Sequence, residues 1–462
     1  MPDTEHRKVI TRSAYQRWEV CCPAGHSYLA VLFVWGSMLA LSFRLFWCIN
    51  RYAVNLFVWD DWIFYDVLSA KSRWWKTFVL QDGPHREGVG VLLASFLLKL
   101  TSWNSRVNGF TIGIAIVLAT VLAIYLKVRV FGTIGFSDVI IPFMFLTLAQ
   151  WEIFLGGPGP SDSAFPLLLT MAYCLAWIQS NRTLRLAQVL VINFLLIFTG
   201  FGLFIGAITV LLLALECYQH ARAKDRKNAI ISLVALLLAT ASVAAFFYGY
   251  VFSPAADCFR FPDGNPARYL WFVALMFARF MGIKHHLAFA SIAGVAVLIL
   301  LIAFLVSHVA QLWKKGWARP ASLVITIVIA YPLLYACATA VGRICFGIEA
   351  SQSSRYMTLL ILAFFGAYFH LLAQRRSRWQ IVFLAVLFTA VFSGSIQRNH
   401  KEMEGIAAGR RAWKQCYLKT ENVPACNAST NVEIYLPKQE RELQRKLQYL
   451  KQNRLNLYAT GN

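Results

Sequence analysis

The sequence predicts an all-α protein, a multi-pass transmembrane bundle of about eleven helices. Hydrophobic residues make up 58% of the 462 residues and charged residues only 14%. Apolar segments repeatedly reach the roughly 20 residues that a helix needs to cross a bilayer. Clusters of Lys and Arg separate alternate apolar segments, which is typical of cytoplasmic loops. The formal net charge of +22 is therefore interpreted as membrane orientation and not as nucleic-acid binding.

The N-terminal third sets the orientation. The basic segment 1–26 is expected in the cytoplasm, and the first span, Ser27–Ile49, leads outward. The acidic segment VWDDWIFYD that follows then lies outside. The apolar run Val89–Leu100 is too short to cross and predicts a helix along the outer surface. The second span descends over Val107–Leu126, and the third rises as far as Trp151.

The remaining spans follow the same alternation. Leu186–Leu215 divides into two spans around Thr199–Gly202, and a re-entrant pair would also fit there. The stretch Tyr269–Gly282 is short and aromatic and predicts a second outer-surface helix. By this count the cytoplasmic loops carry Arg182 and Arg185, residues 222–227, residues 314–319 and residues 375–378, and the outer loops include residues 253–268 and 342–355.

A polar tail, residues 397–462, is predicted to form a small helical domain outside, after a transmembrane domain of residues 27–396. Leucines at helical spacing from Leu443 to Leu457 indicate its helix. Cys416 and Cys426 are close in sequence in an oxidising compartment, which predicts a disulfide. Cys258 and Cys345 also lie outside and could pair, but nothing in the sequence brings them together. No CxxC and no His/Cys cluster has zinc spacing, so a structural metal is not expected.

The outer loops hold a mixture of charges that suits phosphate chemistry. A carboxylate can orient or deprotonate a hydroxyl nucleophile, and an arginine fork can hold a phosphate leaving group. Without such a role, the acidic loop would simply be solvated, and the other charged side chains would only anchor helices at the membrane interface. The residues concerned are Asp60 and Asp61, then His85, Arg86 and Glu87, then Arg343, Glu349 and Arg355.

Four short motifs carry a resemblance to a known class. They are WDDW (59–62), QDGPHREGVG (81–90), WEIFLGG (151–157) and GIEASQSSRY (347–356). In order and sidedness they resemble the GT-C class of membrane glycosyltransferases, over about residues 27–396. The chain looks most like the bacterial members that attach a sugar such as glucose to O-antigen or other cell-envelope polysaccharides.

The resemblance implies an inverting transfer of a sugar, a hexose such as glucose, from a polyprenyl-phosphate donor. The acceptor would be a cell-envelope polysaccharide or lipid-linked glycan at the periplasmic face of a bacterial inner membrane. Asp60 or Asp61 would act on the acceptor hydroxyl. Asp61 is slightly favoured over Asp60. The two side chains would diverge by about 100° on a helix, and the flanking tryptophans can place only one of them at the membrane interface. Arg86, Arg343 and Arg355 would hold the donor phosphate, and the other substrate contacts would come from His85, Glu87, Glu152, Glu349 and Tyr356.

The sequence allows more than one cofactor and more than one function. Asp60 and Asp61 could ligate a divalent cation, Mg²⁺ or Mn²⁺, whereas a phosphate held by arginine needs none; no other cofactor is expected. The expected partners are the lipid-linked donor, a glycan or glycolipid acceptor and membrane lipids, without nucleic acid. A nucleotide-sugar donor does not fit, because no Gly-rich phosphate loop follows a strand.

Two other classes of function remain possible. One is a polysaccharide polymerase or ligase. The other is a lipid-sugar flippase or transporter, which would more often show an inverted repeat, and none is found in the sequence.

Overall fold

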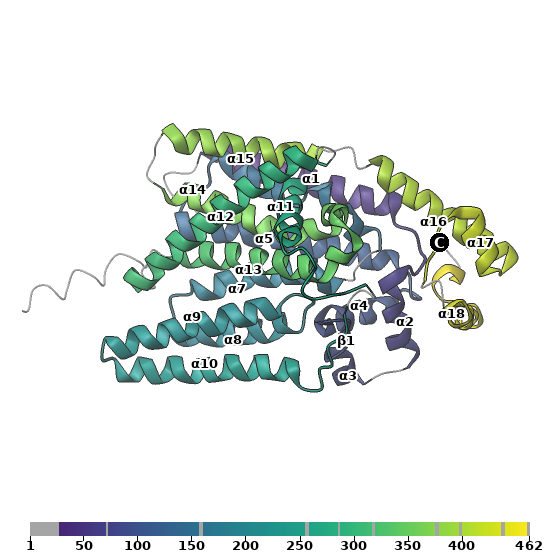
Figure 1. Cartoon of the computed structure of the whole chain (residues 1–462), viewed down its shortest axis with the longest axis horizontal. Coiled ribbons are helices and arrows are strands. Elements are labelled where there is room, and N and C mark those ends of the chain that lie inside the picture. The colour runs from purple at the N-terminus through teal and green to yellow at the C-terminus, as the bar shows by residue number, and fades with distance from the viewer. Residues whose placement is uncertain are drawn as a thin grey trace, which may run out of the picture.

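The computed structural model describes residues 27–70, 73–156, 160–254, 258–284, 287–316, 319–374, 378–396, 400–435 and 439–459. Within these ranges the protein is a bundle of helices, and its one sheet is a pair of two-residue antiparallel strands, β1 (Gln81–Asp82) and β2 (His85–Arg86). Many of the long helices run along the long axis of the molecule, and the short N-terminal helices and the tail helices gather at one end (Figure 1). We call this the loop end.

Among the described residues, nine helical segments are long and apolar enough to cross a membrane. The chain therefore has the transmembrane character that its composition predicts. The segments contain α1 (Tyr28–Tyr52), α5 (Arg106–Phe131), the broken segment Phe136–Phe154, α9 (Leu203–Arg222), α10 (Arg226–Phe247), α12 (Leu287–Lys315), α13 (Pro320–Arg343), α14 (Met357–Ala373), and α15 (Arg378–Ile396) with α16 (His400–Thr420).

Two of the eleven predicted spans are shorter than a bilayer crossing. They are α7 (Ala164–Trp177) with 14 residues and α8 (Arg182–Ile197) with 16, against the roughly 20 that a straight crossing requires. The predicted break between α8 and α9 is present at Phe198–Gly202. A Cβ atom at Gly200 would overlap the carboxylate of Asp162, so glycine allows the break to approach that side chain.

The third predicted span is not one continuous helix. It consists of η2 (Phe136–Val139), α6 (Ile140–Phe145) and η3 (Leu148–Phe154). The Thr147 hydroxyl accepts from the amide of Ala149 at 3.1 Å, and the Gln150 side chain donates to the carbonyl of Phe145 at 2.7 Å. These local side-chain bonds satisfy backbone groups that a continuous helix would pair internally. The interruption leaves η3 as a separate turn at the loop end.

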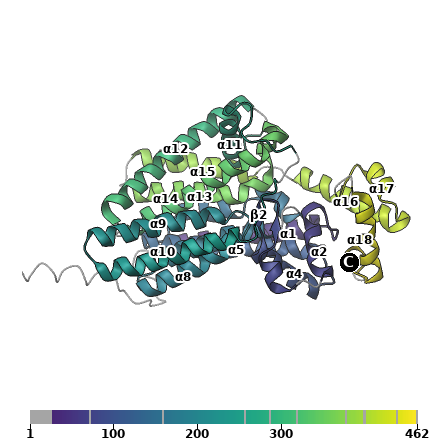
Figure 2. The ribbon, with the colours of Figure 1, turned by 60° about the horizontal axis from the view of Figure 1, so that its bottom comes forward.

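The tail shares its hydrophobic core with the first outer loop and does not enclose a separate core. Short helices α2 (Trp62–Ser69) and α4 (Gly88–Leu100) lie on the side of the loop end that carries α16, α17 (Val423–Thr430) and α18 (Glu440–Gln452), as both views show (Figures 1 and 2). Helix α3 (Trp74–Phe78) packs against α4 instead. The shared core includes Phe57, Trp62, Leu98, Trp413, Tyr417, Leu443, Leu447 and Leu450. The predicted apolar face of α18 is therefore buried, and the tail caps the loop end.

The two predicted surface helices differ in their surroundings. Helix α4 exposes Leu93, Phe96 and Leu100, as an interfacial helix would. Of its large apolar residues, helix α11 (Ala267–Phe280) exposes only Leu270 and Trp271 near its start, because every residue from Phe272 to Phe280 is buried. It packs against α12, α13 and α14, so the prediction of an exposed surface helix is wrong there. Shortness and aromatic content alone do not separate a buried short helix from an interfacial one.

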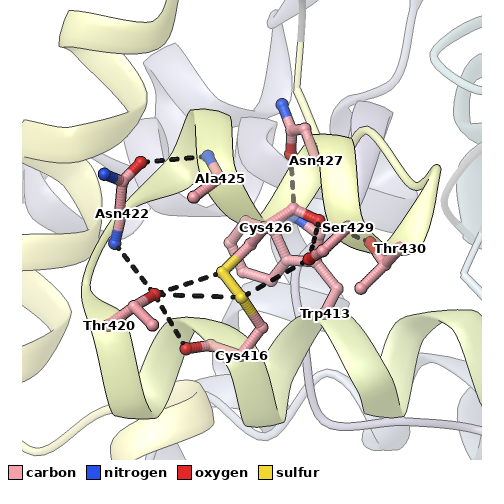
Figure 3. The surroundings of a disulfide bond; sticks show 9 residues. All are labelled: Trp413, Cys416, Thr420, Asn422, Ala425, Cys426, Asn427, Ser429 and Thr430. Carbon is pink, nitrogen blue, oxygen red and sulfur yellow. Dashed lines mark hydrogen bonds between the residues drawn. A yellow bond between two sulfur atoms is a disulfide. The ribbon is translucent and has the colours of Figure 1, made fainter.

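Two disulfides lie at the loop end. One joins Cys416 on α16 to Cys426 on α17, the pairing expected from the sequence, and is flanked by Thr420 and Ser429 (Figure 3). The other joins Cys258 to Cys345, in η6 (Ile344–Phe346), a pairing that the sequence left undecided. It fixes the loop after α10 to the end of α13.

Removing the tail disulfide is expected to loosen the tail and leave the bundle intact. The bond closes a loop of 10 residues. Loop-closure entropy then predicts that a Cys416→Ala, Cys426→Ala variant loses about 2–3 kcal/mol of tail stability. Hydrogen exchange of α16–α18 amides would measure this, with Cys337→Ala, an exposed free cysteine, as the control. Complete alkylation of both tail thiols without reductant would contradict the pairing.

The orientation predicted from the basic loops is testable by labelling. We expect position 224, in the basic loop between α9 and α10, to be cytoplasmic, and Asp61, Asp263, Cys416 and the tail to be outside. Lys224→Cys and Gly264→Cys are suitable single reporters, because Lys224 is exposed and the space around Gly264 is open. In a background whose free cysteines are replaced, an impermeant maleimide should label position 264 and not 224 from the periplasm. The reverse pattern would overturn the orientation.

Candidate functional site

A cavity of about 530 Å³ lies where the loops converge. Its wall comes from the first outer loop, the β1–β2 hairpin, η4 (Pro160–Asp162), the break before α9, the loop after α10, and the α13–α14 connection. The charged groups that line it are four carboxyls and two guanidiniums: Asp60, Asp82, Glu87, Asp162, Arg343 and Arg355. Of the sequence candidates, the cavity brings together Asp60, His85, Glu87, Arg343, Arg355 and Tyr356.

The tail turns the two adjacent aspartates in different directions. Trp59 has a left-handed backbone (φ 51°) and starts η1 (Trp59–Asp61). Its amide and the indole N–H of Trp62 both donate to the carbonyl of Ile434, at 2.9 and 3.0 Å. In this clamped turn Asp60 is exposed and lines the cavity, whereas Asp61 is only 2% exposed.

The Asp61 side chain is buried where the first outer loop meets the tail. Burial raises its pKa to about 7, against the lowering effect of Arg410. The Arg410 guanidinium donates to the carbonyls of Leu155 and Gly156, and a Cβ at Gly156 would lie 3.0 Å from an Asp61 oxygen. The slight preference for Asp61 as the catalytic group is therefore not supported, and Asp60 becomes the candidate base.

Asp61→Asn is expected to change the pH dependence of stability more than turnover. The folded-state pKa of about 7 lies above the unfolded value of about 3.9. The folded state binds this proton more tightly, so the free energy of unfolding falls as the pH rises from about 4 to about 7. Asparagine cannot ionise, so the variant should gain melting temperature relative to the wild type at pH 8 but not at pH 4. Identical pH profiles for the two proteins would contradict this.

The hairpin presents His85 to the cavity and Arg86 to the protein. The His85 ring packs on Phe201 with centroids 4.3 Å apart, and burial lowers its pKa to about 4, so it is neutral at pH 7. Arg86 donates to the carbonyls of Val79, Phe246 and Tyr248 and does not line the cavity. Alternation along the strand separates these neighbours. The expectation that Arg86 holds the donor phosphate does not fit this placement.

Glu87 and Asp162 form a carboxyl pair. Burial, with Asp162 nearby, raises the pKa of Glu87 well above its ordinary value, and burial raises the pKa of Asp162 to about 7. Glu87 therefore keeps its proton and the two side chains hydrogen-bond to each other. Their backbones are joined through Ser161, whose hydroxyl donates to the carbonyl of Glu87 at 2.6 Å and accepts from the amide of Gly90 at 3.1 Å.

Glu152 holds the turn that carries Arg355. One of its carboxylate oxygens accepts from the Ser353 hydroxyl (2.6 Å), the Ser354 hydroxyl (3.0 Å) and the Arg355 amide (2.8 Å). The Arg355 guanidinium in turn donates to Ser353 at 3.2 Å. Glu152 and the exposed Glu349, in η7 (Ile348–Gln352), line a different cavity of about 480 Å³. They are not brought together with Asp60, so Glu152 positions Arg355 instead of contacting a substrate in the first cavity.

No family model, no curated protein and no solved structure matches the chain. Its function is therefore inferred from the cavity and the side chains that line it.

Sequence reasoning missed two carboxylates and the aromatic side of the cavity. Asp82 lies in the quoted QDGPHREGVG motif and Asp162 ends an outer loop, so the rule that selected Asp60 could have selected both. Phe201 and Tyr335, whose rings meet edge to face at 4.6 Å, lie in apolar stretches and give no such signal. Arg343 is two residues from Cys345, so the second disulfide braces this part of the cavity wall.

The sequence suggests that Asp60 and Asp61 could bind a divalent cation together. In the described ranges, no group of three or more His, Cys, Asp or Glu side chains is arranged to hold an ion. Asp61 is buried while Asp60 faces the cavity, so the adjacent pair does not form a joint ligand. A divalent cation at Asp60 would need ligands from the donor phosphate or water.

Proposed function

We propose that the chain is an inverting, GT-C-type glycosyltransferase. It moves a sugar, a hexose such as glucose, from a polyprenyl-phosphate donor to a cell-envelope polysaccharide or lipid-linked glycan, with its site at the periplasmic face of a bacterial inner membrane. The observation that carries the proposal is that Asp60, Arg343 and Arg355 line one cavity at the loop end of an apolar bundle. A lipid donor accounts for this location, because its chain lies in the bilayer while its phosphate and sugar meet water.

The geometry supports a single displacement. Asp60 is exposed to the cavity and accepts the proton of the acceptor hydroxyl as its oxygen bonds to the anomeric carbon. The bond between that carbon and the phosphate oxygen breaks, and polyprenyl phosphate leaves with the bonding electrons. Arg343 and Arg355 stabilise the charge that grows on the leaving phosphate. Attack opposite the leaving group inverts the anomeric configuration.

Transfer from a radiolabelled polyprenyl-phosphate hexose, measured with purified protein in detergent, tests the proposal. A glycosyltransferase attaches single sugars to the acceptor and releases polyprenyl phosphate. A polymerase or ligase instead yields long products from a lipid-linked oligosaccharide. A flippase gives no covalent product and only moves the lipid across a vesicle membrane, and that result would overturn the proposal.

A further inference from the structure

One side of the cavity combines aromatic rings with acidic and hydroxyl groups. The rings of His85, Phe201 and Tyr335 follow one another, with centroids 4.3 and 4.6 Å apart. Glu87 and its partner Asp162 adjoin them, because Asp162 lies against Gly200, next to Phe201. Ser163 completes this side. We call the six residues the aromatic–acidic wall.

The wall holds polar atoms that the described part of the chain leaves without a hydrogen-bond partner. They are the hydroxyl of Ser163, a residue only 2% exposed, and one carboxylate oxygen of Asp162. Buried polar atoms are costly when unpaired. Both residues line the cavity, although the two atoms are covered, so the hydroxyls of a bound molecule can supply the missing bonds once these side chains rotate toward it. Rings beside a few fixed polar groups are the usual make-up of a site for a small polar ligand.

The charges of the cavity limit what that ligand can be. In the proposed function, Arg343 and Arg355 are occupied by the donor phosphate. The charged groups that remain on the lining are acidic: Asp60, Asp82 and Asp162, with Glu87 as the protonated partner of Asp162. Sugar hydroxyls can donate to these carboxylates. A sugar that carries its own carboxylate would face like charges, which should lower its affinity by about 100-fold or more.

We infer that the aromatic–acidic wall binds the sugar of the donor and selects uncharged, polyhydroxylated sugars over uronic acids. This inference rests on the proposed function and specifies its substrate class.

Three ligands with the same lipid test it: polyprenyl phosphate, polyprenyl-phosphate glucose and polyprenyl-phosphate glucuronate. Binding to the full-length protein in nanodiscs is measured without acceptor, so turnover does not interfere. The glucoside should bind more tightly than the sugar-free lipid, and the glucuronate about 100-fold or more weaker than the glucoside.

Two variants separate a ligand contact from a folding effect. Ser163→Ala removes a hydroxyl that has no partner in the described structure, so the melting temperature should not fall. The glucoside should nevertheless bind about three- to tenfold more weakly, with sugar-free polyprenyl phosphate unaffected. Asp162→Asn should narrow the gap between glucoside and glucuronate at least about tenfold. Glu440→Gln, an exposed carboxylate on α18 outside the cavity, is the matched control.

The outcomes distinguish the two proposals. If none of the three lipids binds, the glycosyltransferase proposal is overturned. If all bind alike, or the glucuronate binds more tightly than the glucoside, the donor site stands and the inference about the wall is wrong. An unchanged affinity for the glucoside in Ser163→Ala would likewise remove Ser163 from the sugar site and overturn the wall as defined.

Discussion

Asp60→Asn should lower sugar transfer by about 10²- to 10⁴-fold, the range for losing general acid–base help. Asparagine has nearly the same size and Asp60 is exposed, so the fold should be unchanged. Initial rates of transfer from a radiolabelled polyprenyl-phosphate hexose measure the effect, and the melting temperature checks the fold.

The neighbouring Asp61→Asn is the matched control for this experiment. Its side chain is buried against the tail, so its transfer rate should stay within a few-fold of the wild type. A large loss in Asp61→Asn and none in Asp60→Asn would reverse the assignment. If both variants kept near-native transfer, the mechanism would have no base and a flippase would become the better explanation.

Arg355→Ala should reduce donor affinity and turnover together, by roughly 10- to 100-fold in kcat/KM. A charge-assisted hydrogen bond to phosphate contributes about 1.5–3 kcal/mol, and this one acts on the bound donor as well as on the leaving group. Arg355→Lys should recover only part of the activity, because lysine restores the charge but not the planar fork. Donor titrations at saturating acceptor separate KM from kcat.

Two further variants locate the effect at the cavity. Glu152→Gln weakens the three bonds that hold the 353–355 turn, so it should raise the KM for the donor by less than Arg355→Ala does. Arg86→Ala should leave the KM unchanged and lower the melting temperature, because Arg86 donates to backbone carbonyls and does not itself line the cavity. A KM effect in Arg86→Ala as large as in Arg355→Ala would show that the phosphate lies elsewhere.

The sequence predicts the helical class well, because apolar length is a local property that the bilayer thickness sets. The long apolar helices and the break at Thr199–Gly202 can be read directly from composition. The burial of α11 cannot, because it depends on how α12, α13 and α14 pack around it. The interruption of Phe136–Phe154 also depends on specific side-chain bonds and not on hydrophobicity.

The candidate site shows the same division between local and distant causes. Charged outer loops identify Asp60, Arg343 and Arg355 without any structure. Asp60 and Asp61 point in different directions because the turn that carries them is bonded to the carbonyl of Ile434. Glu152 positions Arg355 because it accepts hydrogen bonds from residues 201 to 203 positions away. The direction of Arg86 depends on carbonyls at the end of α10. Residue type therefore suggests the chemistry, and long-range contacts determine which of two neighbouring side chains faces the cavity.

The carbonyl of Ile434 also sets the earliest time at which the first outer loop can take up its final conformation. Trp62 and Ile434 are separated by 372 positions. A ribosome adds about 5–20 residues per second, so about 20–75 s pass between the synthesis of the first outer loop and the synthesis of its clamp. Asp60 can be fixed in the cavity only after that interval. A nascent chain that stops before the tail would carry every cavity residue and still lack the contact that holds the turn of Asp60 and Asp61.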